Sequence, residues 1–168
     1  MEEDSEKKEY VFDTSALISL GDIKVIGEVL KLAEIVVTPS IVKELEEFAK
    51  YDDEYGKASK EVLKYKDKFI VKNTEIKESI EYIQTTDNEL YNLAKTQSST
   101  LITDDIKFSR HVDGKIDTQF STLFLTLLVS SGHLSKEKAL ELLEKLRGIR
   151  NWRNNIIYLA TKEELEKL

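Results

Sequence analysis

Short apolar runs, rich in β-branched and aromatic residues, recur along the chain and are separated by longer stretches with helical periodicity. A run of this kind, bounded by polar residues, is typical of a buried strand. Strands that alternate with helices predict βαβ units and therefore a parallel sheet. The predicted strands are residues 10–12, 35–37, 69–71 and 101–103, with a short final strand at 114–117.

Start signals mark several of the intervening helices. Thr14 or Ser15 can cap the helix that follows the first strand. Pro39, the only proline, follows Thr38 in the arrangement of an N-cap and a first helical residue. Residues 86–89 form a capping box, Thr-x-x-Glu. Further helices are predicted at 57–66, 76–83, 119–131 and 135–147, and a strand at 156–159 precedes a short helix from Thr161.

The composition is that of one globular domain. The chain has 168 residues, of which 40% are hydrophobic and 34% charged, which is enough to bury a core. Residues 1–9 are strongly charged, which predicts a flexible tail and excludes a signal peptide there. We expect an α/β domain at 10–131 and, packed on the same domain, a helical extension at 132–168.

Two features favour a cytoplasmic protein without a membrane partner. The absence of cysteine excludes disulfides, thiolate zinc sites and cysteine nucleophiles, and it fits a reducing compartment. The longest apolar stretch, residues 123–129, is far shorter than the roughly 20 residues of a membrane span. The net charge of −7 is unlike that of a dedicated DNA-binding protein, although a bound cation and a basic rim would reverse the field locally.

Four segments place a carboxylate where a metal site needs one. Asp13 and the pair Asp104–Asp105 follow the first and fourth predicted strands, and parallel sheets bind ligands outside the carboxyl ends of their strands. Glu44 borders the apolar face of its helix, and Asp87 lies in the first turn of another helix. Each acid alone has an ordinary explanation as a cap, a turn or a surface residue. Together they indicate one site.

Carboxylates that share a pocket repel one another and raise each other's pKa values. Hard divalent cations relieve this repulsion, and all-oxygen ligation favours Mg²⁺ or Mn²⁺ over zinc. Such a site lowers the pKa of a bound water and supports phosphodiester cleavage. A phosphatase is disfavoured, because the segment Asp13-Thr14-Ser15 lacks the second acid of a D-x-D nucleophile motif.

Four motifs follow one another in order: D-T-S-A-L from Asp13, a Pro-started helix with V-x-E-L, a helix D-x-x-L-x-x-L-A from Asp87, and L-I-T-D-D. The intervals between successive acids are 31, 43 and 17–18 residues. This series resembles the PIN-domain family over residues 9–131. The resemblance implies a Rossmann-like, three-layer α/β/α fold with a central parallel sheet, and Mg²⁺- or Mn²⁺-dependent endoribonuclease activity on RNA.

The resemblance also implies partners and residue roles. Members include VapC-type toxins held inactive by an antitoxin and nucleases of ribosomal RNA maturation, so an antitoxin or a ribosome-assembly partner is expected beside the RNA substrate. The region from residue 132 departs from the shortest toxins and is similar to the extension of a subset of the family. By position, Asp13, Glu44, Asp87 and Asp105 would be the catalytic, metal-binding acids, Asp104 would add a further metal ligand, and Thr14, Ser15 and Thr103 would support them.

Basic residues lie after the acidic pair and near the C-terminus. Lys107 and Arg110 are candidates for contacts with an RNA backbone. Arg150 and Arg153 flank Trp152 in the densest basic-aromatic cluster of the chain, a composition that suits RNA binding. Trp152 itself is better explained as a core residue.

Two alternatives stay open at this stage. The same fold would also serve as a non-catalytic RNA-binding or scaffold module whose acids contribute to stability. The apolar helix at 119–131 would allow a homodimer, although packing within one chain explains it equally well.

Overall fold

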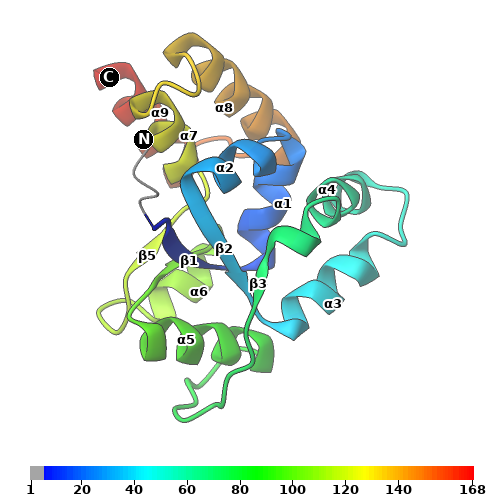
Figure 1. Cartoon of the computed structure of the whole chain (residues 1–168). Coiled ribbons are helices and arrows are strands. Elements are labelled where there is room, and N and C mark those ends of the chain that lie inside the picture. Colours follow the sequence, from blue (N-terminus) through cyan, green and yellow to red (C-terminus); the bar gives the residue numbers. More distant parts are fainter. Residues whose placement is uncertain (1–5) are drawn as a thin grey trace.

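A computed structural model describes residues 6–168 and confirms the predicted parallel sheet (Figure 1). All neighbouring strands are parallel, and their order is β3-β2-β1-β4-β5. Because β1 is central, the chain builds one half of the sheet outward from it and then returns across it to build the other half. The strands are β1 (Lys8–Phe12), β2 (Ala33–Val37), β3 (Ile70–Val71), β4 (Thr100–Ile102) and β5 (Thr118–Gln119).

The turning point of this topology lies between β1 and β4. Phe12 is paired with Ile102, so the two strands end side by side. Beyond them, the backbone N–H of Asp13 still donates a hydrogen bond of 2.9 Å to the carbonyl of Ile102. Open α/β sheets bind ligands outside the carboxyl ends of the strands at such a point. Asp13 and Thr103, the next residues of the two strands, therefore enter this crevice.

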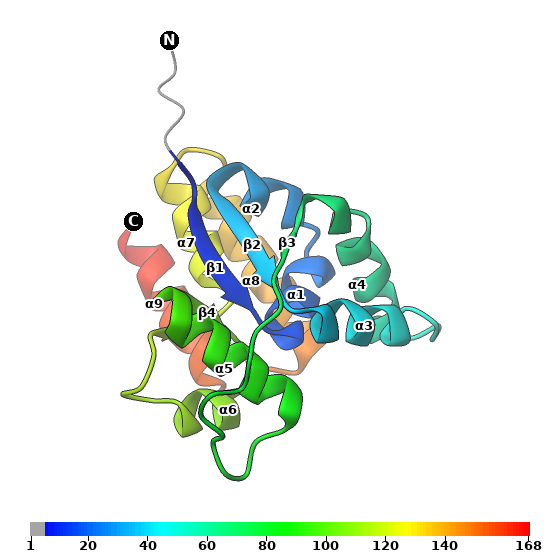
Figure 2. The same cartoon turned by 60° about the horizontal axis from the view of Figure 1, so that its bottom comes forward.

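Helices cover both faces of the sheet, which confirms the three-layer α/β/α fold (Figure 2). On one face, α1 packs against α8 and α2 packs against α7. On the opposite face, α5 packs against β1 and β4. The helices are α1 (Thr14–Asp22), α2 (Ile26–Leu32), α3 (Pro39–Phe48), α4 (Glu54–Leu63), α5 (Thr85–Gln97), α6 (Ile106–His111), α7 (Leu123–Ser130), α8 (Lys136–Arg150) and α9 (Ile156–Lys167), with a 3₁₀ turn η1 (Lys66–Lys68) before β3.

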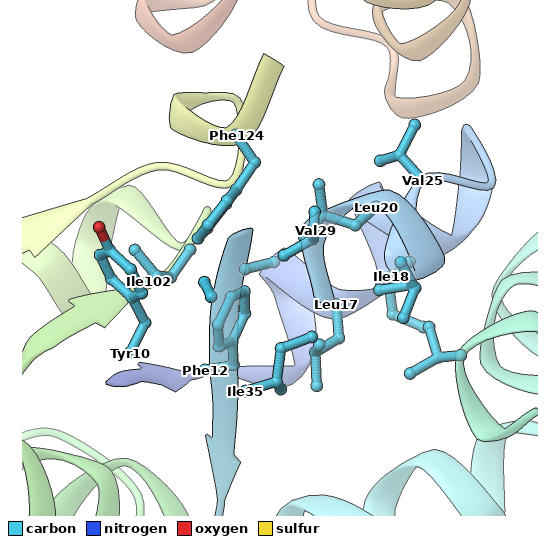
Figure 3. Packing of buried hydrophobic residues seen from close by; sticks show 14 of the residues in the cluster. Tyr10, Phe12, Leu17, Ile18, Leu20, Val25, Val29, Ile35, Ile102 and Phe124 are labelled. Carbon is cyan, nitrogen blue, oxygen red and sulfur yellow. The ribbon is translucent and has the colours of Figure 1, made fainter. Parts of the chain in front are cut away.

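The core is built on strands that are buried on both faces. Val11 and Phe12 of β1 and Ile35 of β2 have no exposed surface, as expected for a parallel sheet between two helical layers. Figure 3 shows Phe124 of α7 against this sheet. Its ring stacks on Phe12 with centroids 5.5 Å apart and meets Tyr10 edge-on at 5.3 Å. This close packing holds the ends of the central strands in fixed positions.

The C-terminal helices contribute to the same hydrophobic core. Leu143 and Leu146 of α8 and Ile157 and Leu165 of α9 are almost fully buried in it. Helix α7 packs against α2, α8 and α9, so its apolar character is explained within one chain and gives no separate reason to expect a homodimer. Among the residues that the structure describes, no helix is long and apolar enough to cross a membrane.

Two predicted elements have a different structure. Residues 76–83, predicted as a helix, form an irregular loop, because side chains of Asn88 and Asn92 in α5 bind the loop backbone in place of a helical ladder. Residues 156–159, predicted as a strand, form the first turn of α9. The cap of that helix is the side chain of Asn155, which accepts a hydrogen bond from the backbone N–H of its second residue at 2.7 Å.

Other differences concern boundaries and short elements. The final strand is β5 at 118–119, and the predicted position 114–117 lies in the turn before it. Helices α2 and α6 were not predicted, because seven and six residues are too short to give a clear periodic signal. Of the predicted tail at 1–9, residues 1–5 lie outside the described residues, and β1 already begins at Lys8.

Candidate active site

A cavity of about 230 Å³ lies at the carboxyl end of the sheet and is bordered by four carboxylates from four different segments. Asp13 follows β1, Glu44 belongs to α3, Asp87 to α5, and Asp105 precedes α6. The fold therefore gathers acids that are far apart in the sequence. The other residues that line the cavity are Thr14, Ser15, Ile18, Phe48, Tyr55, Gln84, Thr86 and Arg150.

Asp13 is the most buried of the four acids and is held by two hydroxyl groups. Its Oδ2 accepts hydrogen bonds from Thr103 Oγ1 at 2.7 Å and from Ser15 Oγ at 2.9 Å. Burial is the main cause that raises the pKa of Asp13, the two hydrogen bonds oppose it and the charge of Glu44 adds to it, with a net pKa of about 6. The carboxylate is thus fixed in orientation, and its pKa lies only a little below neutral pH.

The same two hydroxyl groups tie β4 to β1 across the crevice. Ser15 Oγ accepts a hydrogen bond of 3.0 Å from the backbone N–H of Asp104, and Thr103 Oγ1 accepts one of 3.1 Å from the backbone N–H of Asp105. Each hydroxyl therefore accepts a hydrogen bond from a backbone N–H that follows β4 and donates one to the Asp13 carboxylate. The network fixes the turn that follows β4 relative to the end of β1.

Glu44 and Thr14 face each other on one side of the cavity. Desolvation is the main cause that raises the pKa of Glu44, and the nearby Thr14 hydroxyl opposes it. Even so, Thr14 Oγ1 is buried without a hydrogen-bond partner of normal geometry. A buried hydroxyl without a partner is costly, so this oxygen fits a site that receives a further polar group.

Asp87 carries the clearest sign of mutual repulsion. Its pKa is raised to about 7, first by desolvation and then by the charges of Asp13, Asp105 and Glu44. Asp87 lies in the first turn of α5, where the helix dipole favours the charged form. Desolvation and the repulsion by three acids together outweigh this favourable effect of the helix.

The two acids after β4 have different surroundings. Asp105 is exposed, lines the cavity and caps α6, since its Oδ1 accepts a hydrogen bond of 3.0 Å from the backbone N–H of Phe108. Asp104 is buried, and both of its oxygens are bound by Ser121, through the backbone N–H at 2.8 Å and through Oγ at 2.6 Å. Asp104 is not among the residues that line the cavity, so the structure separates it from the other acids. Its role here is to tie the end of β4 to the segment after β5.

The oxygen donors around the cavity fit a hydrated Mg²⁺ or Mn²⁺ ion. Within residues 6–168, no three carboxylate or imidazole groups lie close enough together to form a complete metal-binding group. Mg²⁺ usually keeps several waters and binds through one or two carboxylates, so a cavity ringed by acids suits it without a closed cage. The acids that line the cavity repel one another at Asp87, which a cation would relieve, and the Thr14 hydroxyl could bind a further polar ligand.

Only part of the predicted basic rim reaches this region. Arg150, at the C-terminal end of α8, lines the cavity, and its guanidinium lies 5.5 Å from the ring centroid of Tyr55 in a cation–π contact. Lys107 lines a neighbouring cavity, whereas Arg110 and Arg153 border neither cavity. Trp152, the aromatic member of the basic-aromatic cluster, is buried with 7% of its surface exposed, as expected for a core residue.

Several residues of the cavity were missed in the sequence. Phe48 lies one turn after Glu44 on α3, and that spacing alone would have placed it beside the acid. Tyr55, in the first turn of α4, lines the cavity, whereas Tyr51, four residues before it, does not. Gln84, at the N-cap position of α5, carries no signal that the sequence reveals.

Comparisons with known proteins agree with this geometry. The family model described as a PIN domain matches residues 9–167, which includes the four acids and both C-terminal helices. A search of curated proteins gave no match.

Proposed function

Since the chain belongs to the PIN-domain family, we propose that it is a Mg²⁺- or Mn²⁺-dependent endoribonuclease that hydrolyses phosphodiester bonds of RNA. PIN domains are generally nucleases. The observation that carries the proposal is the convergence of Asp13, Glu44, Asp87 and Asp105 on one cavity at the turning point of the sheet. Desolvation and, after it, repulsion by the other three acids raise the pKa of Asp87 to about 7, which supports a positively charged occupant of the cavity.

The four acids would hold the metal, and the surroundings of Asp13 and Asp87 suit them to this task. When bound, a divalent cation supplies polarisation of the phosphoryl group and a water of lowered pKa. Ser15 and Thr103 donate hydrogen bonds to Asp13 Oδ2 and so orient this carboxylate before any ligand arrives. Asp87 is partly protonated near neutral pH in the absence of a cation, and a positive charge in the cavity would lower its pKa and favour the carboxylate.

Arg150 would position the negatively charged substrate at this acidic site. Its guanidinium is permanently charged, lines the cavity and is held against the ring of Tyr55. A planar guanidinium can bind two oxygens of one phosphate. The helical extension would thus supply the cationic part of a site whose acids come from the rest of the domain.

The test is cleavage of a labelled structured RNA by the purified protein in Mn²⁺ or in EDTA. We expect cleavage that requires the metal and that is lost in Asp13→Asn and in Glu44→Gln. Glu47→Gln is the matched control, because Glu47 lies on the same helix, is exposed and pairs with Lys50 at 2.8 Å. Full activity of Asp13→Asn would refute the mechanism.

Two biological roles are compatible with this activity. The protein would act either as a toxin controlled by an antitoxin or as a nuclease of RNA maturation with a ribosome-assembly partner. Expression of the wild type and of Asp13→Asn in a bacterial host separates them. Growth arrest that requires Asp13 would favour the toxin, and accumulation of unprocessed ribosomal RNA in a deletion strain would favour the processing enzyme.

A non-catalytic RNA-binding or scaffold module is the second candidate. It is favoured by one observation, the absence of a complete metal-binding group within the described residues. This module would bind RNA equally well in EDTA and in Mn²⁺ and would leave the RNA intact. Its melting temperature would not respond to Mn²⁺.

A further inference from the structure

A second cavity, of about 210 Å³, adjoins the acidic one. Gln84, Asp87 and Asp105 line both cavities, so the two share a wall formed in part by two of the proposed metal-binding acids. The opposite side of the second cavity differs in character, because it is lined by an aromatic residue, Tyr82, and by basic side chains on α6. A chain of nucleotides bound at the acids would pass into this space.

Tyr82 is displayed to solvent in an unusual backbone conformation. Its side chain is 84% exposed, the highest value among the large hydrophobic residues of the described chain. Its φ of 69° lies in the left-handed region, which costs a tyrosine energy that a glycine would not incur. An exposed aromatic ring at a strained position contributes nothing to the core, so neither packing nor local propensity explains it.

The loop that carries Tyr82 is fixed to α5. Asn92 Oδ1 accepts hydrogen bonds from the backbone N–H groups of Lys77 and Glu78, both at 3.0 Å, and its Nδ2 donates to the carbonyl of Glu78 at 2.8 Å. Asn88 Oδ1 accepts one of 2.7 Å from the backbone N–H of Ile80. Both asparagines are buried. The ring is therefore presented from an ordered backbone, which reduces the entropy lost when a ligand stacks on it.

Lys107 adds a cation to the same cavity, and His111 adds an imidazole that can donate a hydrogen bond. Both belong to α6, whose first turn is capped by Asp105, so they are held at a fixed distance from the acids. Lys107 is exposed and carries a full positive charge, which suits a contact with a phosphate. The cavity thus combines a flat aromatic surface with basic groups, the two features that bind an unpaired nucleotide.

We propose that this second cavity binds a nucleotide that neighbours the scissile phosphate, with its unpaired base stacked on Tyr82 and its phosphate beside Lys107 and His111. This inference rests on the proposed function, since the scissile phosphate is located by the acids. Stacking requires an exposed base face, which a base inside a duplex does not offer. The substrate at this position is therefore single-stranded RNA, a loop or a frayed end.

The test is binding of a fluorescently labelled single-stranded RNA hexamer to the Asp13→Asn protein in Mg²⁺, followed by fluorescence anisotropy. Tyr82→Ala should raise Kd about tenfold, within the range known for base–aromatic stacking. Tyr82→Phe should bind as the parent protein does, because it keeps the ring. Tyr51→Ala is the matched control, since Tyr51 is also exposed, at 63%, and borders neither cavity.

Two further measurements separate stacking from a structural effect. A hexamer with abasic sites throughout should bind more weakly, and Tyr82→Ala should weaken it no further. Lys107→Gln should lower the number of ions released on binding, obtained from the salt dependence of Kd, by about one. The proposal is overturned if Tyr82→Ala behaves like Tyr51→Ala, if its penalty persists with the abasic strand, if a duplex of the same sequence binds equally well, or if no single strand binds.

The outcomes for the subsite and for the nuclease are distinguishable. Metal-dependent cleavage without an effect of Tyr82 on binding would overturn only the subsite. Binding that depends on Tyr82, together with RNA that stays intact in Mn²⁺, would overturn only the nuclease.

Discussion

Replacing Asp87 by asparagine should stabilise the protein at and above neutral pH when divalent cations are absent. The pKa of Asp87 is raised from an ordinary value of 3.8 to about 7, because of desolvation and of the charges of Asp13, Asp105 and Glu44. A carboxyl group with a raised pKa in the folded state binds its proton more tightly there than in the unfolded chain. The free energy of unfolding therefore falls as pH rises from about 4 to about 7. Asparagine keeps the shape of the side chain and removes the charge.

The size of the effect follows from the two pKa values. At about 1.4 kcal/mol per pKa unit, the change from 3.8 to about 7 corresponds to about 4 kcal/mol when the group is fully charged. Asp87 is only partly buried, so solvent and salt screen its interactions, and we expect about half of this, roughly 2 kcal/mol. For a chain of this length that corresponds to a rise in Tm of about 4–8 °C.

The assay is urea denaturation of the wild type and of Asp87→Asn in EDTA at several pH values. The gain in unfolding free energy should be small at about pH 4.5 and reach its full size at about pH 8. Mg²⁺ should stabilise the wild type more than the variant, because the variant has lost part of the repulsion that a cation relieves. A gain that is the same at all pH values, or a loss of stability at about pH 8, would refute the assignment of repulsion to this carboxylate.

Four other substitutions test the arrangement around the two cavities. Thr103→Val removes a hydrogen bond that lowers the pKa of Asp13, so the acidic limb of the pH–rate profile should move to higher pH; an unchanged profile would speak against this role. Asp104→Ala should lower the free energy of unfolding in urea by about 1–3 kcal/mol, since it leaves the buried N–H of Ser121 without its acceptor. Asp105→Asn should keep the cap of α6 and the stability of the protein but lose metal-dependent cleavage. Tyr82→Gly should raise the free energy of unfolding by about 1 kcal/mol, because glycine adopts a φ of 69° without strain, while it weakens RNA binding as Tyr82→Ala does.

The sheet and the acids were accessible to sequence reasoning because each depends on a strong local signal. The strands that end at Phe12 and Ile102 are continuous apolar runs that are buried on both faces, and an acid directly after such a run must lie at the edge of the sheet. Glu44 was assigned from helical periodicity, and the structure brings it to the same cavity. These predictions needed only the neighbours in sequence and the rule of parallel topology.

The remainder depends on contacts between distant residues. Both Asp104 and Asp105 are predicted as metal ligands from the sequence, and the contact with Ser121 after β5 accounts for the burial of the first, while the second lines the cavity. The loop at 76–83 has a helix-compatible composition, but the side chains of Asn88 and Asn92, on a helix that follows it, hold its backbone in another form. Tertiary partners of this kind leave no local signal, so periodicity alone could not reveal them.

The causes of the pKa shifts distinguish Asp87 from acids that serve stability, because burial alone also raises the pKa of the structural Asp104. Glu78 shows the second kind of behaviour: Lys95 and Tyr91 donate hydrogen bonds to it and hold its pKa below the ordinary value. Asp13 and Asp87 show the opposite, because burial and neighbouring acids raise their pKa values to about 6 and about 7. A cap or an ion pair stabilises the folded state through its charge, whereas these carboxylates destabilise it until a positive charge arrives. The fold tolerates this cost because its core lies elsewhere. The charges of three neighbouring acids, added to burial at Asp87, are the feature that favours a cation-dependent site over a purely structural one.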